Sequence, residues 1–217
     1  MNGRETPVIY KVRYYGDPVL RKRAKPVTVF DESLAQLGKD MLETMYTANG
    51  VGLAAPQIGL SVRLFVALEM GSRDAKDEAV GQEGEPEAED LTPEEKRERW
   101  GVIAEHVMVN PEIVSRKGIQ HGVDGCLSLP GLFVEEMQRD LHVRVRYQDV
   151  RGKTQEQDAE GHFAHVIQHE LDHLDGILFF DRLPETGRRE FLDEHRRELA
   201  DFQREAKSFL KELKQAG

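Results

Sequence analysis

The residues best suited to chemistry lie in one short segment, His169-Glu170-Leu171-Asp172-His173. Two histidines four positions apart lie on one face of a helix, about one turn from each other, so both imidazoles can reach a single metal ion. Glu170 directly follows the first histidine, where its carboxylate can take a proton from water on that ion. The spacing therefore predicts a metal-dependent hydrolase with Glu170 as the general acid–base.

A third protein ligand has to come from another part of the chain, because catalytic sites usually use three and leave one position open. A zinc peptidase would take it from a glutamate on a following helix, and the candidates are Glu190, Glu194 and Glu198. The rival donor is Cys126, which lies between glycine and proline residues as a ligand-presenting turn should. A thiolate and two imidazoles suit a divalent transition metal.

Two further histidines, His162 and His165, precede the motif on the same helix. His165 lies a full turn before His169, so a ligand set that included it would extend along two turns. We expect His162 and His165 to line the pocket or its rim, and not to bind the ion.

Composition limits the possible functions of this chain of 217 residues, which we expect to form a single domain over residues 1–217. The net charge of −10 argues against sequence-specific binding of nucleic acid, which needs a basic face. Much of the charge lies at about residues 72–99, which we interpret as a mobile acidic insertion with a short helix near Pro93–Arg99. With one cysteine, no bilayer-length apolar run and no secretory signal, we expect a cytoplasmic protein without membrane contact.

Hydrophobic periodicity predicts short strands followed by late helices. Alternating apolar residues indicate strands at 61–69 and 141–147, with 154–160 pairing back as a hairpin, and two strands at 102–109 and 112–116 separated by Asn110-Pro111. Helices are predicted after Asp31, at 161–175 and, as an amphipathic C-terminal helix, at about 186–214. The order favours an α+β fold with short antiparallel sheets around the central metal-binding helix.

Three motifs together resemble the peptide deformylase family. They occur in the family's order: Gly50-Val51-Gly52-Leu53-Ala54-Ala55-Pro56-Gln57, Asp124-Gly125-Cys126-Leu127-Ser128 and Gln168-His169-Glu170-Leu171-Asp172-His173. Shorter matches, such as Asn110-Pro111-Glu112 and Asp175-Gly176-Ile177-Leu178-Phe179, support them. The resemblance extends from about Tyr10 to Leu183, apart from the acidic insertion.

The resemblance implies an enzyme that removes the formyl group from the N-terminal formyl-methionine of newly made polypeptides. Its metal ligands would be Cys126, His169 and His173, with water in the fourth position and Glu170 as general base and then acid. It also implies one divalent ion per chain, with Fe²⁺ in the cell and Zn²⁺ or another ion possible after purification.

The same resemblance assigns the remaining site residues. The oxyanion formed during hydrolysis would be stabilised by the Gln57 side-chain amide and the Leu127 backbone N–H. The substrate cleft would be lined by Val51, Gly52, Leu127 and Val166. The partners would be N-formylmethionyl nascent peptides and, through the C-terminal helix, the ribosome, although basic and acidic residues of that helix nearly balance.

One departure from the family pattern concerns the second motif, which usually begins with Glu where this chain has Asp124. We expect Asp124 to pair with Arg139 and to help fix the Cys126 turn. Two alternatives remain open from the residues alone, one in the same broad class of metal-dependent hydrolases and one in a different class. They are a zinc peptidase indifferent to replacement of Cys126 and a binding protein that has kept a metal site; a structural zinc site would need a fourth protein ligand.

Overall fold

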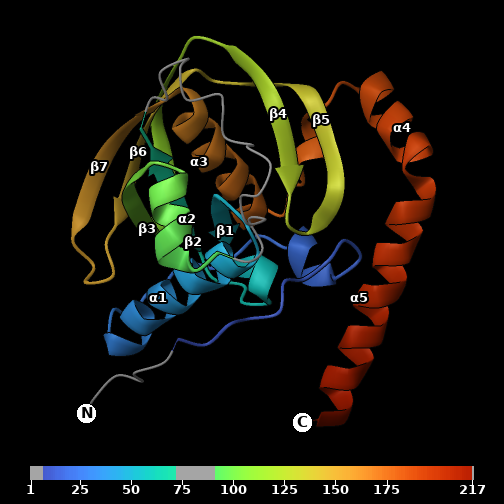
Figure 1. Ribbon diagram of the computed structural model, residues 1–217, viewed down its shortest axis with the longest axis horizontal. Helices are drawn as coiled ribbons and strands as arrows, with labels where there is room; N and C mark the ends of the chain where they lie inside the picture. Colours follow the sequence, from blue (N-terminus) through green and yellow to red (C-terminus); the bar gives the residue numbers. More distant parts are fainter. Residues whose placement is uncertain (1–6, 72–90, 217) are drawn as a thin grey trace.

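A computed structural model describes residues 7–71 and 91–216 of the chain. Its centre is an antiparallel sheet of five strands in the order β1-β2-β3-β6-β7, with a separate two-stranded sheet formed by β4 and β5 (Figure 1). The strands of the large sheet are β1 (Gly52–Ala54), β2 (Leu64–Met70), β3 (Val102–Lys117), β6 (His142–Gln148) and β7 (Thr154–Glu160). The predicted α+β fold with short antiparallel sheets is confirmed.

Helices cover both faces of this sheet, and strand β2, which lies between β1 and β3, is apolar on both sides. Phe65 and Ala67 pack in the cluster that contains helix α3 (Gly161–Leu174). Leu64, Val66 and Leu68 instead pack in the cluster that contains helix α1 (Glu32–Thr47). Strand β2 begins three residues later than predicted from the alternation that starts at Ser61.

Two predicted elements are confirmed closely. Helix α1 begins after Asp31, whose side chain accepts hydrogen bonds from the backbone N–H groups of Ser33 and Leu34. Strands β6 and β7 pair antiparallel as the predicted hairpin, with His142 opposite Glu160. The hairpin leads directly into helix α3.

The prediction of two strands around Asn110-Pro111 was wrong, because β3 is one strand with an irregularity at that position. Its pairing with β6 shifts register between Val109 and Glu112. Asn110 has a positive φ of 50°, and its side chain donates hydrogen bonds to Val27 O and Gln148 Oε1. A bulge accommodates a proline, which has no N–H for the sheet, so the strand continues past it.

The single C-terminal helix predicted at 186–214 is in fact two helices, α4 (Glu185–Glu194) and α5 (Arg196–Ala216). The break at His195 lets Phe191 of α4 and Leu199 of α5 both enter one aromatic cluster with Phe179 and Phe180. Helix α5 then runs along one side of the molecule (Figure 1). Its Phe209 packs under the cationic groups of Lys11 and Arg13 near the chain's N-terminal segment.

The predicted acidic insertion lies mostly outside the described residues, which omit 72–90. The short helix expected at its end is confirmed as α2 (Pro93–Arg99), which begins with a capping box between Thr92 and Glu95. Three 3₁₀-helices complete the described elements: Pro18–Arg21, Ala55–Ile58 and Phe179–Arg182. Within the described parts of the chain, no helix is both long and apolar enough to cross a bilayer.

Candidate metal centre

Helix α3 places both motif histidines on one side of its last two turns. The helix is buried from Phe163 to Leu174, and its apolar side packs against the large sheet. His169 and His173 are both buried, and their ring centres lie 4.9 Å apart. The helix ends where predicted, because Gly176 adopts a φ of 74° that residues with a side chain rarely tolerate.

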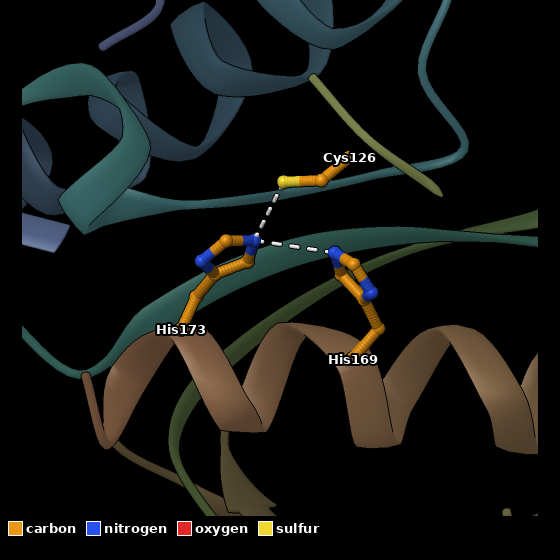
Figure 2. Close-up of side chains that lie close together, drawn as sticks. All are labelled: Cys126, His169 and His173. Carbon is orange, nitrogen blue, oxygen red and sulfur yellow. Dashed lines mark hydrogen bonds between the residues drawn. The ribbon is translucent and has the colours of Figure 1, made fainter. Parts of the chain in front are cut away.

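Cys126 reaches the same point from the hairpin of β4 (Gln120–Cys126) and β5 (Leu129–Arg139). Figure 2 shows its sulfur facing the two imidazoles across the surface of α3. The His173 Nε2 lies 3.2 Å from Cys126 Sγ and 3.2 Å from His169 Nε2. In the described parts of the chain these are the residues whose donor atoms, within 4.8 Å of one another, could hold a metal ion.

The donor atoms fit a four-coordinate transition metal. Two nitrogens at about 2.05 Å from a tetrahedral ion are about 3.3 Å apart, close to the observed 3.2 Å. Glu190, Glu194 and Glu198, the alternative third donors, lie on α4 and α5 and do not join this cluster. The arrangement therefore favours Cys126 as the third donor and leaves one coordination position open.

Asp124 holds His169 in the orientation that a ligand needs. Asp124 Oδ1 lies 2.6 Å from His169 Nδ1, which places the proton there and turns the Nε2 lone pair toward Cys126 and His173. Asp124 Oδ2 accepts hydrogen bonds from Arg139 Nη2 at 2.7 Å and Nε at 3.2 Å, so the predicted Asp124–Arg139 pair is confirmed. Arg139 also donates to Asp172 Oδ2 at 2.6 Å.

The surroundings of the cluster shift the pKa values of its two histidines in opposite directions. Burial alone would lower the pKa of His169, but the charge and hydrogen bond of Asp124 raise it well above the usual value. Burial and the charge of His169 lower the pKa of His173. Asp124 itself would have its pKa raised by burial, but the charge of His169, its contacts with His165 and His169, and Arg139 hold it far below its usual value. Asp124 is therefore ionised at neutral pH.

Glu170 is a buried carboxyl group beside the cluster. It is 3% exposed, and its Oε2 has no hydrogen-bond partner among the described residues. Burial raises the pKa of Glu170 to about 7, which suits a group that both accepts and donates a proton. Gly52 leaves the space that the carboxylate occupies, because a Cβ there would lie 2.9 Å from Glu170 Cδ.

The Gln57 amide is oriented by its surroundings. Its Oε1 accepts a hydrogen bond from the Ala54 backbone N–H at 2.8 Å. Its Nε2 therefore points toward Cys126 Sγ, 3.6 Å away, and Ser128 Oγ, 3.4 Å away. A buried N–H group beside the metal-donor residues could stabilise negative charge on a substrate oxygen by a hydrogen bond.

One cavity of about 600 Å³ is bordered by Gln57, Cys126, His169 and Glu170. It is large enough for an amino-acid side chain and the adjoining peptide. Its lining includes the four residues predicted for the substrate cleft, namely Val51, Gly52, Leu127 and Val166. His162 and His165 also line it, as predicted, and neither belongs to the donor cluster. A larger hollow of about 1020 Å³ lies by β6 and β7 and contains none of the donor residues.

Sequence reasoning missed two parts of the site. It did not identify the strands β4 and β5, because Gln120–Cys126 contains two glycines and no regular apolar alternation. It also missed the contact between His165 Nε2 and Asp124 Oδ2, which lie 3.1 Å apart. The available signal for that contact was a histidine one helical turn before the predicted ligand His169.

Comparison with known proteins agrees with this geometry. Residues 9–189 match the model of a family described as polypeptide deformylase. This chain belongs to the polypeptide deformylase family. A peptide deformylase of Thermus thermophilus is 50% identical over 208 residues, which cover 96% of this chain and 100% of the relative. One from Thermotoga neapolitana is 43% identical, with 83% and 90% of the two chains covered.

Solved deformylase structures share the fold. The crystal structure of a peptide deformylase from Thermus thermophilus superposes with a TM-score of 0.75 at 47% identity, covering 91% of this chain and 99% of that one. Arabidopsis thaliana peptide deformylase 1B gives a TM-score of 0.68 at 32% identity, covering 91% and 92%. The family and the enzyme class predicted from the three motifs are therefore confirmed, and the family agrees with a metal ion at the donor cluster.

Proposed function

We propose that this deformylase hydrolyses the formyl amide of N-formylmethionyl peptides at the cavity beside Cys126, His169 and His173. The observation that carries the proposal is the placement of Glu170. Its partnerless Oε2 is buried next to the donor cluster and shares the cavity with Gln57. The methionine side chain would occupy the apolar part of this cavity, near Val51 and Val166.

Each protein group has a separate role in the proposed reaction. A divalent ion held by the cluster would act as a Lewis acid that lowers the pKa of water and polarises the formyl carbonyl. Glu170 accepts a proton from the attacking water and then donates it to the departing amine. The Gln57 Nε2 and the Leu127 backbone N–H donate to the formyl oxygen as its negative charge develops.

We propose Fe²⁺ as the ion used in the cell, with Zn²⁺ able to occupy the same donors. One thiolate and two imidazoles bind both ions, so the donor set alone supports either. We further propose that the enzyme acts in the cytoplasm on peptides that are still being synthesised. Docking of the C-terminal helices α4 and α5 on the ribosome stays a prediction, and the basic and acidic residues of the two helices nearly balance.

The test is hydrolysis of a short N-formylmethionyl peptide under anaerobic conditions, after loading wild type and Glu170→Ala with ferrous iron. The wild type should release formate. The variant should bind the same amount of iron and release formate about 10²- to 10⁴-fold more slowly. Iron-loaded wild type that releases no formate would refute the proposal, and an active Glu170→Ala would refute the role of that carboxylate.

A further inference from the structure

His165 lies beside the carboxylate that orients the donor residue His169. The residue lies on α3, is 9% exposed, and its ring faces β4. Its Nε2 is 3.1 Å from Asp124 Oδ2, and its Nδ1 lies on the side of Gly122, 3.9 Å from where a Cβ would be. Nε2 makes no well-aligned hydrogen bond with any described residue. The polar group that it faces is the Asp124 carboxylate.

Asp124 has to be held firmly, because rotation of its carboxylate would move the His169 ring. Arg139 holds Oδ2, but the same guanidinium also binds Asp172 at 2.6 Å. Asp172 is bound in turn by Arg182, which is half-exposed. The arginine is therefore shared between two buried carboxylates, and His165 approaches Asp124 Oδ2 from a different element.

His165 also borders the cavity, in contrast to Arg139. It therefore touches both the wall of the cavity and the carboxylate behind His169. His162, one turn earlier on the same helix, borders the same cavity, is exposed, and makes no ion pair with Asp124. The two histidines thus share a location but differ in their contact with Asp124.

We propose that His165 is a positioning residue, which restrains Asp124 and thereby keeps His169 Nε2 directed at the donor cluster. This inference rests on the proposed metal site, but not on the deformylation chemistry. It assigns His165 a function distinct from that of His162, which is only a wall residue. Removing the hydrogen-bonded partner of a metal ligand, here Asp124, typically changes metal affinity by about 10- to 100-fold. His165 acts one residue further from the ion, through Asp124.

The test compares three variants in the zinc-loaded protein: His165→Leu, His165→Gln and the matched control His162→Leu. The readout is the rate at which a chromophoric chelator removes zinc, measured without any substrate. His165→Leu should release zinc up to about tenfold faster than wild type, because it acts through Asp124 and so should change affinity less than loss of the ligand's own partner. His165→Gln keeps an N–H near the position of Nε2, so it should restore release to near the wild-type rate. His162→Leu should not change it.

A spectroscopic readout separates positioning from a general loss of stability. In the cobalt-loaded protein, the visible absorption bands report the geometry of the ligands, and they should shift in His165→Leu but not in His162→Leu. Wild-type zinc release and an unshifted spectrum in His165→Leu would overturn the proposal. Equal effects of both leucine variants would also overturn it, because a wall residue without the Asp124 contact would then suffice.

Kinetics with an N-formylmethionyl peptide keep this inference separate from the proposed function. His165→Leu should lower kcat more than it changes KM, since it disturbs the metal ligand, whereas His162→Leu should act mainly on KM. If the wild type releases no formate while His165→Leu still accelerates zinc release, the function fails and the positioning role stands. If the wild type turns over normally while His165→Leu releases zinc at the wild-type rate, the function stands and the positioning role fails.

Discussion

Gly52 packs directly against Glu170, and the Glu170 carboxylate fits there only because residue 52 has no side chain. A Cβ at residue 52 would lie 2.9 Å from Glu170 Cδ and 3.0 Å from Glu170 Cγ. Gly52 is the first residue of β1, and Glu170 lies on α3, which contacts that strand. A glycine of the first sequence motif thus leaves the space for the proposed acid–base residue of the third.

Gly52→Ala should therefore impair catalysis without removing the metal. The added methyl group would push the Glu170 carboxylate away from the donor cluster, and a displacement of about 1 Å can lower a rate by about 10²-fold. We expect kcat to fall by about that factor while zinc content stays at the wild-type level. Both are measured on the purified protein, by peptide deformylation and by metal analysis.

Gly187→Ala is the matched control for this change. Gly187 lies in helix α4, and its added Cβ would meet Leu183, just before that helix, only at 3.9 Å, an ordinary contact. Alanine in a helix is about 0.5–1 kcal/mol more favourable than glycine, so this variant should be fully active and slightly more stable. Full activity in Gly52→Ala would contradict the proposed spatial constraint on Glu170.

The sequence allowed the chemistry to be predicted more fully than the architecture. His169, Glu170 and His173 lie four residues or fewer apart on one helix, so local periodicity alone brings them together. Cys126 was a candidate from its residue type, and its choice over the glutamates came from the family motifs. The Asp124–Arg139 pair was predicted from the family pattern, because Asp124 keeps the negative charge of the usual glutamate and can still pair with a cation.

The features that sequence reasoning missed all depend on contacts between distant residues. Strands β4 and β5 are stabilised by pairing with each other and by packing on the aromatic cluster of Phe179, Phe180 and Phe191, which local patterning does not reveal. The interruption of the C-terminal helix at His195 likewise follows from burial of residues on both sides of it. Single-sequence periodicity predicts a continuous helix there, because every apolar spacing is preserved across the break.

Replacing Gln57 should test stabilisation of the oxyanion. Gln57→Leu removes the buried Nε2 donor next to Cys126, and loss of one such donor typically lowers kcat by about 10²- to 10³-fold. The Ala54 N–H also loses its acceptor, so the free energy of unfolding should fall by about 1–3 kcal/mol. Steady-state kinetics and urea unfolding measure the two effects.

Ser128→Ala provides the comparison for Gln57→Leu. It removes the hydroxyl group 3.4 Å from Gln57 Nε2 but leaves the amide itself in place. Its kcat should therefore stay within a few-fold of wild type. If the two variants lose activity equally, the amide is not the group that acts on the substrate oxygen.

Asp124→Asn should destabilise the metal-free protein in a way that depends on pH. The folded-state pKa of Asp124 lies below its unfolded value of about 3.9. Its ionised form therefore contributes stability above that value, and this contribution is lost as the pH falls through the folded-state pKa. Breaking the buried pair with Arg139 should cost about 3 kcal/mol between about pH 5 and 7.

The measurement for Asp124→Asn is urea unfolding of both proteins at several pH values. The difference in the free energy of unfolding should shrink as the pH falls below about 4, because Asp124 then takes up a proton in the unfolded wild-type chain while it stays ionised in the folded one. A difference that is independent of pH down to the acid transition would mean that shape, and not charge, makes Asp124 important.

Removing the metal should lower thermal stability, and the size of the effect should depend on Cys126. An ion that binds the folded chain alone adds about 4 kcal/mol when its concentration is about 1,000 times Kd. Zinc should therefore raise the Tm of wild type, whereas Cys126→Ser, with a weaker donor, should show a much smaller increase. Asp31→Ala is the control: it removes the cap of α1 and should cost about 1 kcal/mol with and without zinc. A zinc-dependent rise in Cys126→Ser equal to that of wild type would exclude Cys126 as a ligand.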